Sequence, residues 1–212
     1  IENPKAYLEN NIIGFYNISE VAKENKIKHF MFASTSSVYG NQNKFPIMEN
    51  YNTNEPQSFY AATKKSNEVI AYANSNLFKI PTTCLRFFTV FGPYGRPDMS
   101  LFLFVNKILN NKPINVFNNG NHIRDFTYID DATFMVEKLI QKSSQATVPY
   151  QIFNITNSKP IPLSRFIKAI TDQLTDNIRI NYLKIQKGDV VKTHGSNFNI
   201  KKVIKVPHPT SI

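Results

Sequence analysis

Tyr60 and Lys64 stand four residues apart in the segment Tyr60-Ala-Ala-Thr-Lys64. Four residues are slightly more than one turn of an α-helix, so both side chains project from the same helical face. A free phenol has a pKa of about 10, and a neighbouring ammonium group stabilises the phenolate and lowers that value. The pair is therefore a candidate general base that takes a proton from an alcohol.

A run of hydroxyl side chains precedes this pair. The apolar run that begins at Phe30 ends in Ser34-Thr-Ser-Ser37, which is typical of a buried strand with a polar end. Such a strand can bring Thr35, or a neighbouring serine, to the phenol of Tyr60, where it would share the proton of the alcohol. A surface Tyr–Lys pair and an ordinary strand end remain the structural alternative.

Helical and strand patterns alternate around these residues. Apolar residues at helical spacing predict helices over residues 3–24, 59–76, 100–110, 131–142 and 163–174. Short apolar runs predict strands over residues 28–33, 82–88, 114–117, 125–128, 151–155 and 179–183. The alternation indicates an α/β fold. A polar loop is expected over residues 40–58, and Ser100 is a candidate N-cap.

Composition narrows the class of protein. Of the 212 residues, 42% are hydrophobic, which suffices for a sizeable core. The one cysteine, Cys84, lies in an apolar run, so we expect a buried thiol in a reducing, cytoplasmic compartment. No apolar run approaches the roughly 20 residues that cross a bilayer, and no membrane partner is expected.

The charge and the histidine content argue against a nucleic-acid-binding protein and a metalloprotein. The net charge is +10, but the lysines are scattered and form no basic arm, so no nucleic-acid partner is expected. A polyanionic small substrate would account for part of this excess. The histidines lack metal-ligand spacing, so we expect no metal and interpret them as surface or packing residues. They are His29, His122, His194 and His208.

Seven segments follow one another in an order that is typical of a known family. They are Asn11-Ile-Ile-Gly14, Ser34-Thr-Ser-Ser-Val-Tyr-Gly40, Tyr60-Ala-Ala-Thr-Lys64, Leu85-Arg-Phe-Phe-Thr-Val-Phe-Gly-Pro93, Gly95-Arg-Pro-Asp-Met99, Arg124-Asp-Phe-Thr-Tyr-Ile-Asp-Asp131 and Gly188-Asp-Val190. From Pro4 to about Val206 the chain resembles extended short-chain dehydrogenases/reductases, and within them nucleotide-sugar epimerases and dehydratases. It is most similar to UDP-glucuronate 4-epimerases of the capsule and lipopolysaccharide type.

This resemblance implies roles around the Tyr–Lys pair. Tyr60 would take the proton of the sugar 4-hydroxyl while C4 gives hydride to NAD, Lys64 would hydrogen-bond the nicotinamide ribose, and Thr35 would stabilise the developing oxyanion. Re-reduction of the 4-keto sugar from its opposite face would give the epimer. The other cofactor-binding residues implied are Asn11, Ser34 and Phe88, of which Phe88 is also compatible with strand packing.

The substrate-binding residues implied are Ser36, Ser37, Thr89, Arg96, Val116, Phe117, Arg124 and Asp189. Related dehydratases carry Asp-Glu after the threonine, and related decarboxylases carry a Glu there, whereas this chain has Ser36 and Ser37. Serine cannot perform that acid–base chemistry, so an epimerase is favoured. Arg96, helped by Thr89, would pair with a C6 carboxylate, or else face solvent or cap a carbonyl. Asp189 matches a ribose-contacting position.

Two further residues would contact the nucleotide. Arg124 resembles the family arginine that binds the diphosphate, and its alternative is a pair with Asp125 or Asp130. Phe117 would stack on uracil beside the Val116 backbone, and its alternative is a place in the core.

The glycines bear on how much of the family fold is present. The 7 glycines form no Gly-x-Gly-x-x-Gly or Gly-x-x-Gly-x-x-Gly, the turn with which a dinucleotide fold opens. We therefore interpret the chain as a fragment that contains the C-terminal part of a Rossmann-type parallel sheet and a smaller α/β substrate-binding region. Residues 1–92 would be the remainder of the NAD-binding domain, with its first remaining strand at an open edge, and residues 93–212 mainly the substrate region.

The sequence thus predicts NAD-dependent 4-epimerisation of a UDP-sugar, UDP-glucuronate to UDP-galacturonate, for surface polysaccharide synthesis. One alternative is a UDP-glucose or UDP-N-acetylglucosamine 4-epimerase. Another is a non-catalytic remnant, and we expect the 212-residue chain alone to bind no NAD and to be inactive. The resemblance also implies a homodimer of the full-length form through the helices over residues 3–24 and 59–76.

Overall fold

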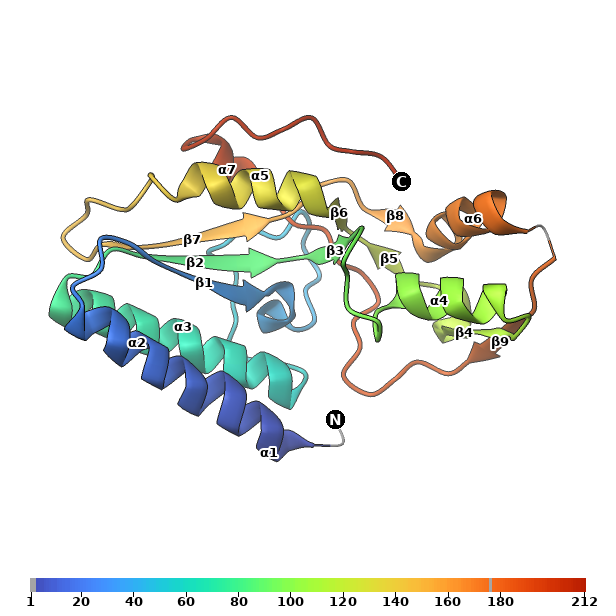
Figure 1. The fold of residues 1–212 in the computed structure, drawn as a ribbon, viewed down its shortest axis with the longest axis horizontal. Coiled ribbons are helices and arrows are strands. Elements are labelled where there is room, and N and C mark those ends of the chain that lie inside the picture. Colours follow the sequence, from blue (N-terminus) through green and yellow to red (C-terminus); the bar gives the residue numbers. More distant parts are fainter. Residues whose placement is uncertain (1–2, 176) are drawn as a thin grey trace.

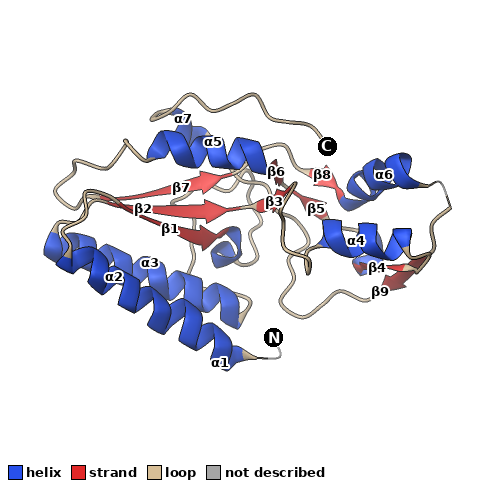
Figure 2. Ribbon diagram, viewed as in Figure 1, coloured by secondary structure: helices blue, strands red, loops and turns tan. Residues whose placement is uncertain are grey.

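A parallel sheet forms the centre of one half of the molecule (Figures 1 and 2). The computed structural model describes residues 3–175 and 177–212. The sheet has the order β1-β2-β7, with β1 at Phe30–Thr35, β2 at Thr82–Phe87 and β7 at Tyr150–Ile155. Thr35 lies beside Phe87, and Phe87 beside Ile155, so the carboxyl ends of the strands meet at one edge. Side chains from all three strand ends can therefore contribute to one site.

Helices cover both faces of this sheet (Figure 1). Adjacent residues of a strand point to opposite faces. Cys84 accordingly packs with residues of α2 (Gly14–Glu24) and α3 (Phe59–Phe78), whereas Leu85 packs with residues of α5 (Ile129–Leu139) and α7 (Phe198–Lys201). The central strand β2 is buried on both sides, as expected of a parallel strand that helices cover on both faces.

The helix predicted over residues 3–24 is present, with an irregular turn inside it. It consists of α1 (Pro4–Tyr7), the π-helical turn η1 (Leu8–Ile13) and α2. The side chain of Asn3 caps its start by accepting a hydrogen bond from the Ala6 amide at 3.1 Å. A π turn is rare and often occurs near functional residues.

The second half of the molecule contains three small two-stranded sheets and two helices. The sheets pair β3 (Thr89–Phe91) with β6 (Phe126–Tyr128), β4 (Ile114–Phe117) with β9 (Ile180–Leu183), and β5 (Ile123–Arg124) with β8 (Ile161–Pro162); the helices are α4 (Ser100–Leu109) and α6 (Leu163–Leu174). Phe126 stacks on Phe166 with ring centroids 4.3 Å apart, at the centre of the core that joins these elements.

Several predicted boundaries shift. The strand predicted over residues 28–33 begins at Phe30, whose amide bonds to the Pro81 carbonyl at 2.8 Å. The prediction of Ser100 as N-cap is wrong, because Met99 occupies the cap position and Ser100 is already helical. Six short elements were not predicted, because two to four residues carry too little periodicity: η2 (Ser36–Tyr39), β3, η3 (Asn118–Gly120), β5, β8 and α7.

The predicted α/β fold is confirmed, and β1 is an outer strand of the sheet in the described part of the chain. The domain boundary near residue 92 stays a prediction. In the described residues, no helix combines the length and apolar character that crossing a bilayer requires.

Candidate active site

The Tyr60–Lys64 pair lies in the first turns of α3. The hydroxyl of Ser58 accepts a hydrogen bond from the Ala61 amide at 3.2 Å and so starts the helix just before Tyr60. Lys64 is half-buried, and its Nζ donates to the carbonyl oxygen of Ala33 at 3.0 Å. Burial lowers the pKa of Lys64. The ammonium group thus ties the helix to β1, two residues before Thr35.

Tyr60 is half-buried beside the N-terminal helix. Its ring lies 5.6 Å from the ring of Tyr7. In the described part of the chain the Tyr60 hydroxyl makes no hydrogen bond to Lys64 or to Thr35. The predicted proton-sharing contact between Tyr60 and Thr35 therefore stays a prediction.

Thr35 marks the carboxyl end of β1. It is 8% exposed, and its hydroxyl accepts a hydrogen bond from the Ser37 amide and donates one to the Ser37 hydroxyl, both at 3.2 Å. These contacts cap η2, in which Ser36 is half-buried and Ser37 exposed. The three predicted hydroxyl residues therefore lie together at the strand end.

A buried ion pair that sequence reasoning missed fixes α3 to the sheet. Glu68 follows Lys64 by one further turn on the same face, and Arg86 comes from β2; each is 2% exposed. Arg86 donates to both carboxylate oxygens of Glu68, at 2.9 and 2.7 Å, and Ser34 donates to Glu68 Oε1 at 2.6 Å. Burial acts to raise the pKa of Glu68, but these hydrogen bonds outweigh it and leave that pKa below its usual value.

The other three predicted cofactor residues, Ser34, Phe88 and Asn11, have partners within the protein. The Ser34 hydroxyl is buried and engaged by Glu68. Phe88 is 4% exposed and belongs to an apolar cluster with Val38 and Ile47, which is the packing alternative considered for it. Asn11 lies in the π turn, and its Nδ2 donates to the Thr63 hydroxyl at 2.9 Å. Cofactor contacts for Asn11, Ser34 and Phe88 stay predictions.

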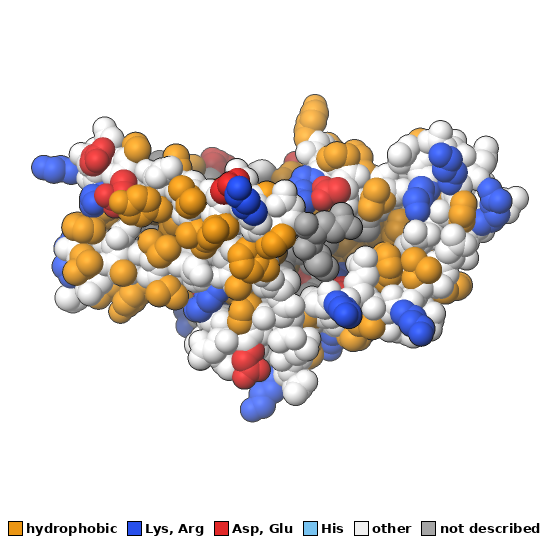
Figure 3. All heavy atoms as spheres, turned by 90° about the horizontal axis from the view of Figure 1, so that it is seen from below, with side chains coloured by type: hydrophobic (Ala, Val, Ile, Leu, Met, Phe, Trp, Pro, Cys, Tyr) orange, Lys and Arg blue, Asp and Glu red, His pale blue; other side chains and the backbone are white. Residues whose placement is uncertain are grey.

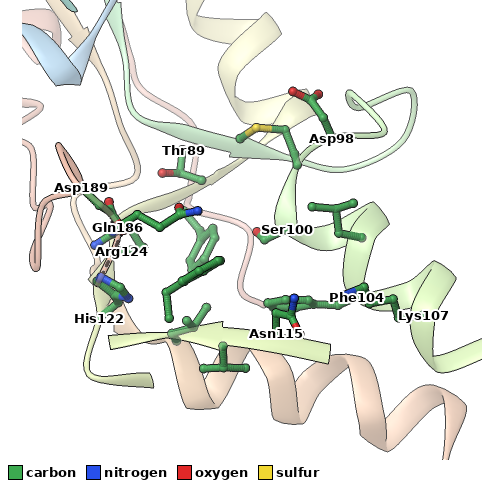
Figure 4. A pocket seen from close by; sticks show the side chains of 16 residues that line it. Thr89, Asp98, Ser100, Phe104, Lys107, Asn115, His122, Arg124, Gln186 and Asp189 are labelled. Atoms are coloured by element: carbon green, nitrogen blue, oxygen red, sulfur yellow. Dashed lines mark hydrogen bonds and ion pairs between the residues drawn. The ribbon is translucent and has the colours of Figure 1, made fainter. Parts of the chain in front are cut away.

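A cavity of about 670 Å³ lies between α4, β4 and residues 186–189 (Figure 4). It brings together five of the predicted substrate residues, which are Thr89, Val116, Phe117, Arg124 and Asp189. Val116 is 1% exposed and belongs to the adjoining core, whereas Phe117 is half-buried on the cavity wall. The cavity therefore offers apolar surface at β4 and charged groups at the opposite wall.

Arg124 pairs neither with Asp125 nor with Asp130. Its Nη2 donates to Asp189 Oδ1 at 2.8 Å and its Nη1 to the Val191 carbonyl at 3.0 Å. Burial lowers the pKa of Arg124 despite the Asp189 carboxylate. The pairing alternative considered for Arg124 thus identified the wrong carboxylate.

Asp125 is instead completely buried. Its Oδ2 accepts hydrogen bonds from the Thr156 hydroxyl at 2.6 Å and the Gly195 amide at 2.9 Å, while its Oδ1 has no partner in the described part of the chain. Burial raises the pKa of Asp125 to about 6. Asp125 joins β6 to two other segments and lies away from the cavity surface.

His122, one of the four histidines interpreted as surface or packing residues, is buried in the structure. It is 3% exposed and lines the cavity, with its Nε2 3.2 Å from Asp189 Oδ2 (Figure 4). Only its place two residues before Arg124 could have indicated this from the sequence. Within the described residues, no group of three or more His, Cys, Asp or Glu side chains is arranged to hold a metal ion.

Arg96 lies outside the lining of this cavity. It is exposed and forms an ion pair with Asp98, with Nε 3.0 Å from Oδ1. The Asp98 carboxylate raises the pKa of Arg96. Asp98 itself lines the cavity.

Comparisons with known proteins indicate one family for this chain. The model of the NAD dependent epimerase/dehydratase family matches residues 1–156. Protein CapI of Staphylococcus aureus is 41% identical over the whole chain, which covers 68% of that protein, and UDP-glucuronate 4-epimerase 4 of Arabidopsis thaliana is 40% identical over 92% of the chain, which covers 48% of that protein.

A solved structure agrees as well. The UDP-glucuronic acid 4-epimerase from Bacillus cereus, in complex with UDP-glucuronic acid and NAD, superposes with a TM-score of 0.89 and 28% identity over 96% of this chain and 64% of that one. The family model matches most of the chain, and the curated relatives extend the likeness beyond it. The chain therefore belongs to the NAD dependent epimerase/dehydratase family.

Proposed function

We propose that this chain is part of an NAD-dependent epimerase that converts UDP-glucuronate to UDP-galacturonate by transient oxidation at C4. The observation that carries the proposal is the placing of Tyr60 and Lys64 on the face of α3 that is tied to β1 just before Thr35. The neighbouring half of the molecule adds a cavity large enough for a nucleotide-sugar, with Arg124 on its wall.

The residues present fit one end of NAD. An ammonium group has three donors, and in the described part of the chain Lys64 uses one of them, on the Ala33 carbonyl. Donors therefore remain for the hydroxyl groups of a nicotinamide ribose. When bound, NAD would supply the hydride acceptor for C4 of the sugar. No glycine-rich turn for its diphosphate is present among the 212 residues, so this fit covers the nicotinamide end only.

The chain's own residues would handle the proton. The Tyr60 oxygen would take the proton of the sugar 4-hydroxyl, beside the ammonium group of Lys64, which its bond to β1 holds in place. Thr35 would donate a hydrogen bond to the oxygen at C4 as negative charge develops there. For return of the hydride to the other face, Tyr60 would give the proton back.

Arg96 supports glucuronate as the sugar. Its guanidinium group already holds a carboxylate, that of Asp98, in a paired contact. A C6 carboxylate would be an equivalent partner. Ser36 and Ser37 supply no carboxyl group for a dehydration, which supports epimerisation over that reaction.

The test is an assay of the protein with NAD and a panel of UDP-glucuronate, UDP-glucose and UDP-N-acetylglucosamine, followed by chromatography of the sugars. It would be run on the 212-residue chain and on any longer product of the same reading frame. Conversion of UDP-glucuronate, lost by about 10²–10⁴-fold in Tyr60→Phe, is expected of the catalytic form. Preferential conversion of either other sugar would overturn glucuronate as the substrate.

The non-catalytic alternative has its own measurement. We expect the 212-residue chain to give no heat with NAD in calorimetry, because it offers ligands for the nicotinamide end alone. Micromolar affinity would contradict this expectation and remove the main support for a remnant. A cytoplasmic location stays a prediction.

We further propose a homodimer through α2 and α3. Figure 3 shows hydrophobic side chains scattered over the face of the molecule that is seen from below. Both helices expose large apolar side chains, among them Ile18 at 60%, Val69 at 58% and Leu77 at 70% exposure. Such a patch is characteristic of an interface. Light scattering of the wild type and of Val69→Glu would test it: a dimer that becomes a monomer supports the proposal, and a wild-type monomer overturns it for this chain.

A further inference from the structure

His122 is a buried base at the charged end of the cavity. It is 3% exposed, and its backbone is fixed on both sides, by its amide on the Gly120 carbonyl and by its carbonyl oxygen on the Leu163 amide, both at 2.8 Å. Its side chain lines the cavity beside Arg124 and Asp189 (Figure 4). Its Nε2 forms no hydrogen bond with any described residue, although it lies 3.2 Å from Asp189 Oδ2.

The carboxylate of Asp189 therefore faces two side chains, those of Arg124 and His122. Asp189 Oδ1 accepts from Arg124 at 2.8 Å, and Asp189 Oδ2 faces His122. With His122 neutral, the positive charge of Arg124 and the negative charge of Asp189 cancel. Such a cluster has little net attraction for a diphosphate, although Arg124 lies where the resemblance places the diphosphate ligand.

Arg124 alone is poorly placed to bind a diphosphate, because its Nη1 and Nη2 groups are already engaged. Its Nη1 is engaged by the Val191 and Ile123 carbonyls, and its Nη2 by Asp189. The other cation on the cavity lining is Lys107 of α4, which Figure 4 places at the far end from Arg124. His122 is the nearby group that can gain a charge.

The charged groups around His122 determine when its imidazole takes up a proton. Burial, together with the Arg124 guanidinium group, lowers the pKa of His122, and Asp189 opposes the shift only in part. Of the described lining residues, the other charged ones are Asp98 and Lys107 on the α4 side, while the start of α6 contributes the apolar Leu163. A diphosphate beside Arg124 would offset the positive charge that keeps His122 neutral.

We propose that a nucleoside diphosphate ester enters this cavity together with one proton, which is taken from solvent by His122. The cluster then changes from net neutral to net positive, and the imidazolium donates its Nε2–H either to a phosphate oxygen or to Asp189, which releases Arg124 toward the phosphate. The inference rests on the proposed function for the class of ligand. It assigns to His122 a positioning and charge-sensing role that no relative's name implies.

The test is calorimetry of the 212-residue chain with UDP-glucuronate at about pH 7, in buffers of different ionisation enthalpy. The dependence of the observed heat on the buffer gives the number of protons taken up. We expect net uptake, approaching one proton per ligand, and an association constant that falls by up to about tenfold per pH unit where the proton is taken up. Uridine, which lacks the diphosphate, should bind without uptake.

Matched variants assign the proton. His122→Asn should abolish the uptake, whereas His194→Asn, the same change at a histidine outside the cavity lining, should retain it. If His122→Asn does not fold, NMR titration of the wild-type imidazoles replaces it, and one of the four histidines should gain a higher pKa with UDP-glucuronate.

The outcomes separate the inference from the proposed function. Binding without proton uptake, or uptake that persists in His122→Asn, overturns the inference and leaves the cavity as the nucleotide-sugar site. Failure of UDP-glucuronate to bind at millimolar concentration overturns both the assignment of the cavity and the inference.

Discussion

The two halves of the site hold their charged groups in different ways. Around α3, Glu68 and Arg86 are inaccessible to solvent and satisfy each other within a network that reaches β1. Around the cavity, the Asp189 side chain is 31% exposed, and the Arg96–Asp98 pair lies at the surface. A ligand can therefore replace one member of an ion pair in the second half, whereas it cannot reach the buried Glu68–Arg86 pair in the first. If the proposed function holds, the first half would position the reacting groups, and the second would exchange its internal ion pairs for contacts with substrate.

The largest effect should come from breaking the buried pair. Glu68→Gln leaves Arg86 buried beside a neutral partner, and we expect the free energy of unfolding to fall by about 3–5 kcal/mol. Urea denaturation followed by circular dichroism measures this. Glu137→Gln, at an exposed carboxylate that contacts Lys138, is the matched control and should change stability by no more than about 0.5 kcal/mol. Equal effects of the two variants would contradict the contrast between the halves.

Asp125 provides a pH-dependent test of burial. Its pKa in the folded protein is about 6, above the value of 3.8 expected when unfolded, so the folded state binds the proton more tightly. The stability that this carboxyl group contributes is fully present below pH 3.8, and it is lost as the pH rises through about 6. Asp125→Asn carries no charge to bury, and its advantage over the wild type should grow from pH 4 to pH 7, to at most about 3 kcal/mol. Urea denaturation of both proteins from pH 4 to pH 7 measures this. A difference in the free energy of unfolding that does not change with pH would contradict the prediction.

Arg124→Lys tests whether the cavity needs a forked donor. A lysine cannot bond Asp189, the Val191 carbonyl and a phosphate with the same planar geometry, so we expect UDP-glucuronate to bind about tenfold more weakly, a loss of about 1.4 kcal/mol. Calorimetry of the variant measures the loss. Arg165→Lys, an exposed position on α6 outside the cavity lining, serves as control and should bind as the wild type does.

The smallest effect on stability is expected at Arg96. Because its ion pair with Asp98 is exposed, Arg96→Ala should change the free energy of unfolding by less than about 0.5 kcal/mol. The ratio of affinities for UDP-glucuronate and UDP-glucose should nevertheless fall. Asp98→Ala removes the competing carboxylate and should raise that ratio, so changes of the same sign in both variants would refute the carboxylate contact.

Local patterns predicted the parts of the site that lie within one element. The spacing of Tyr60 and Lys64 is helical, and the helix is present, because four-residue spacing and the Ser58 cap are encoded within a few positions. The pair of Glu68 and Arg86 joins residues 18 positions apart on different elements, and no periodicity carries that information. Glu68 could have been suspected, since it continues the spacing of 60 and 64.

The cavity was predictable only in part. The motifs named Arg124 and Asp189 separately, but their contact spans 65 positions, and it was not among the alternatives considered. The place of His122 on the cavity lining was not predicted, because a single histidine carries no spacing signal.

The π turn at Leu8–Ile13 gives the first helix one residue more than a regular spiral would use. Upstream of it, Tyr7 faces Tyr60; downstream, Phe15 packs on Phe30 and Phe32 of β1. Deleting one residue within the turn would rotate one end relative to the other by about 100°, so that only one of these contacts could survive. The additional residue of the π turn therefore fixes the rotation of Tyr7 relative to Phe15. It allows Tyr7 to contact Tyr60, the proposed base, while Phe15 packs on β1, the strand that ends at Thr35.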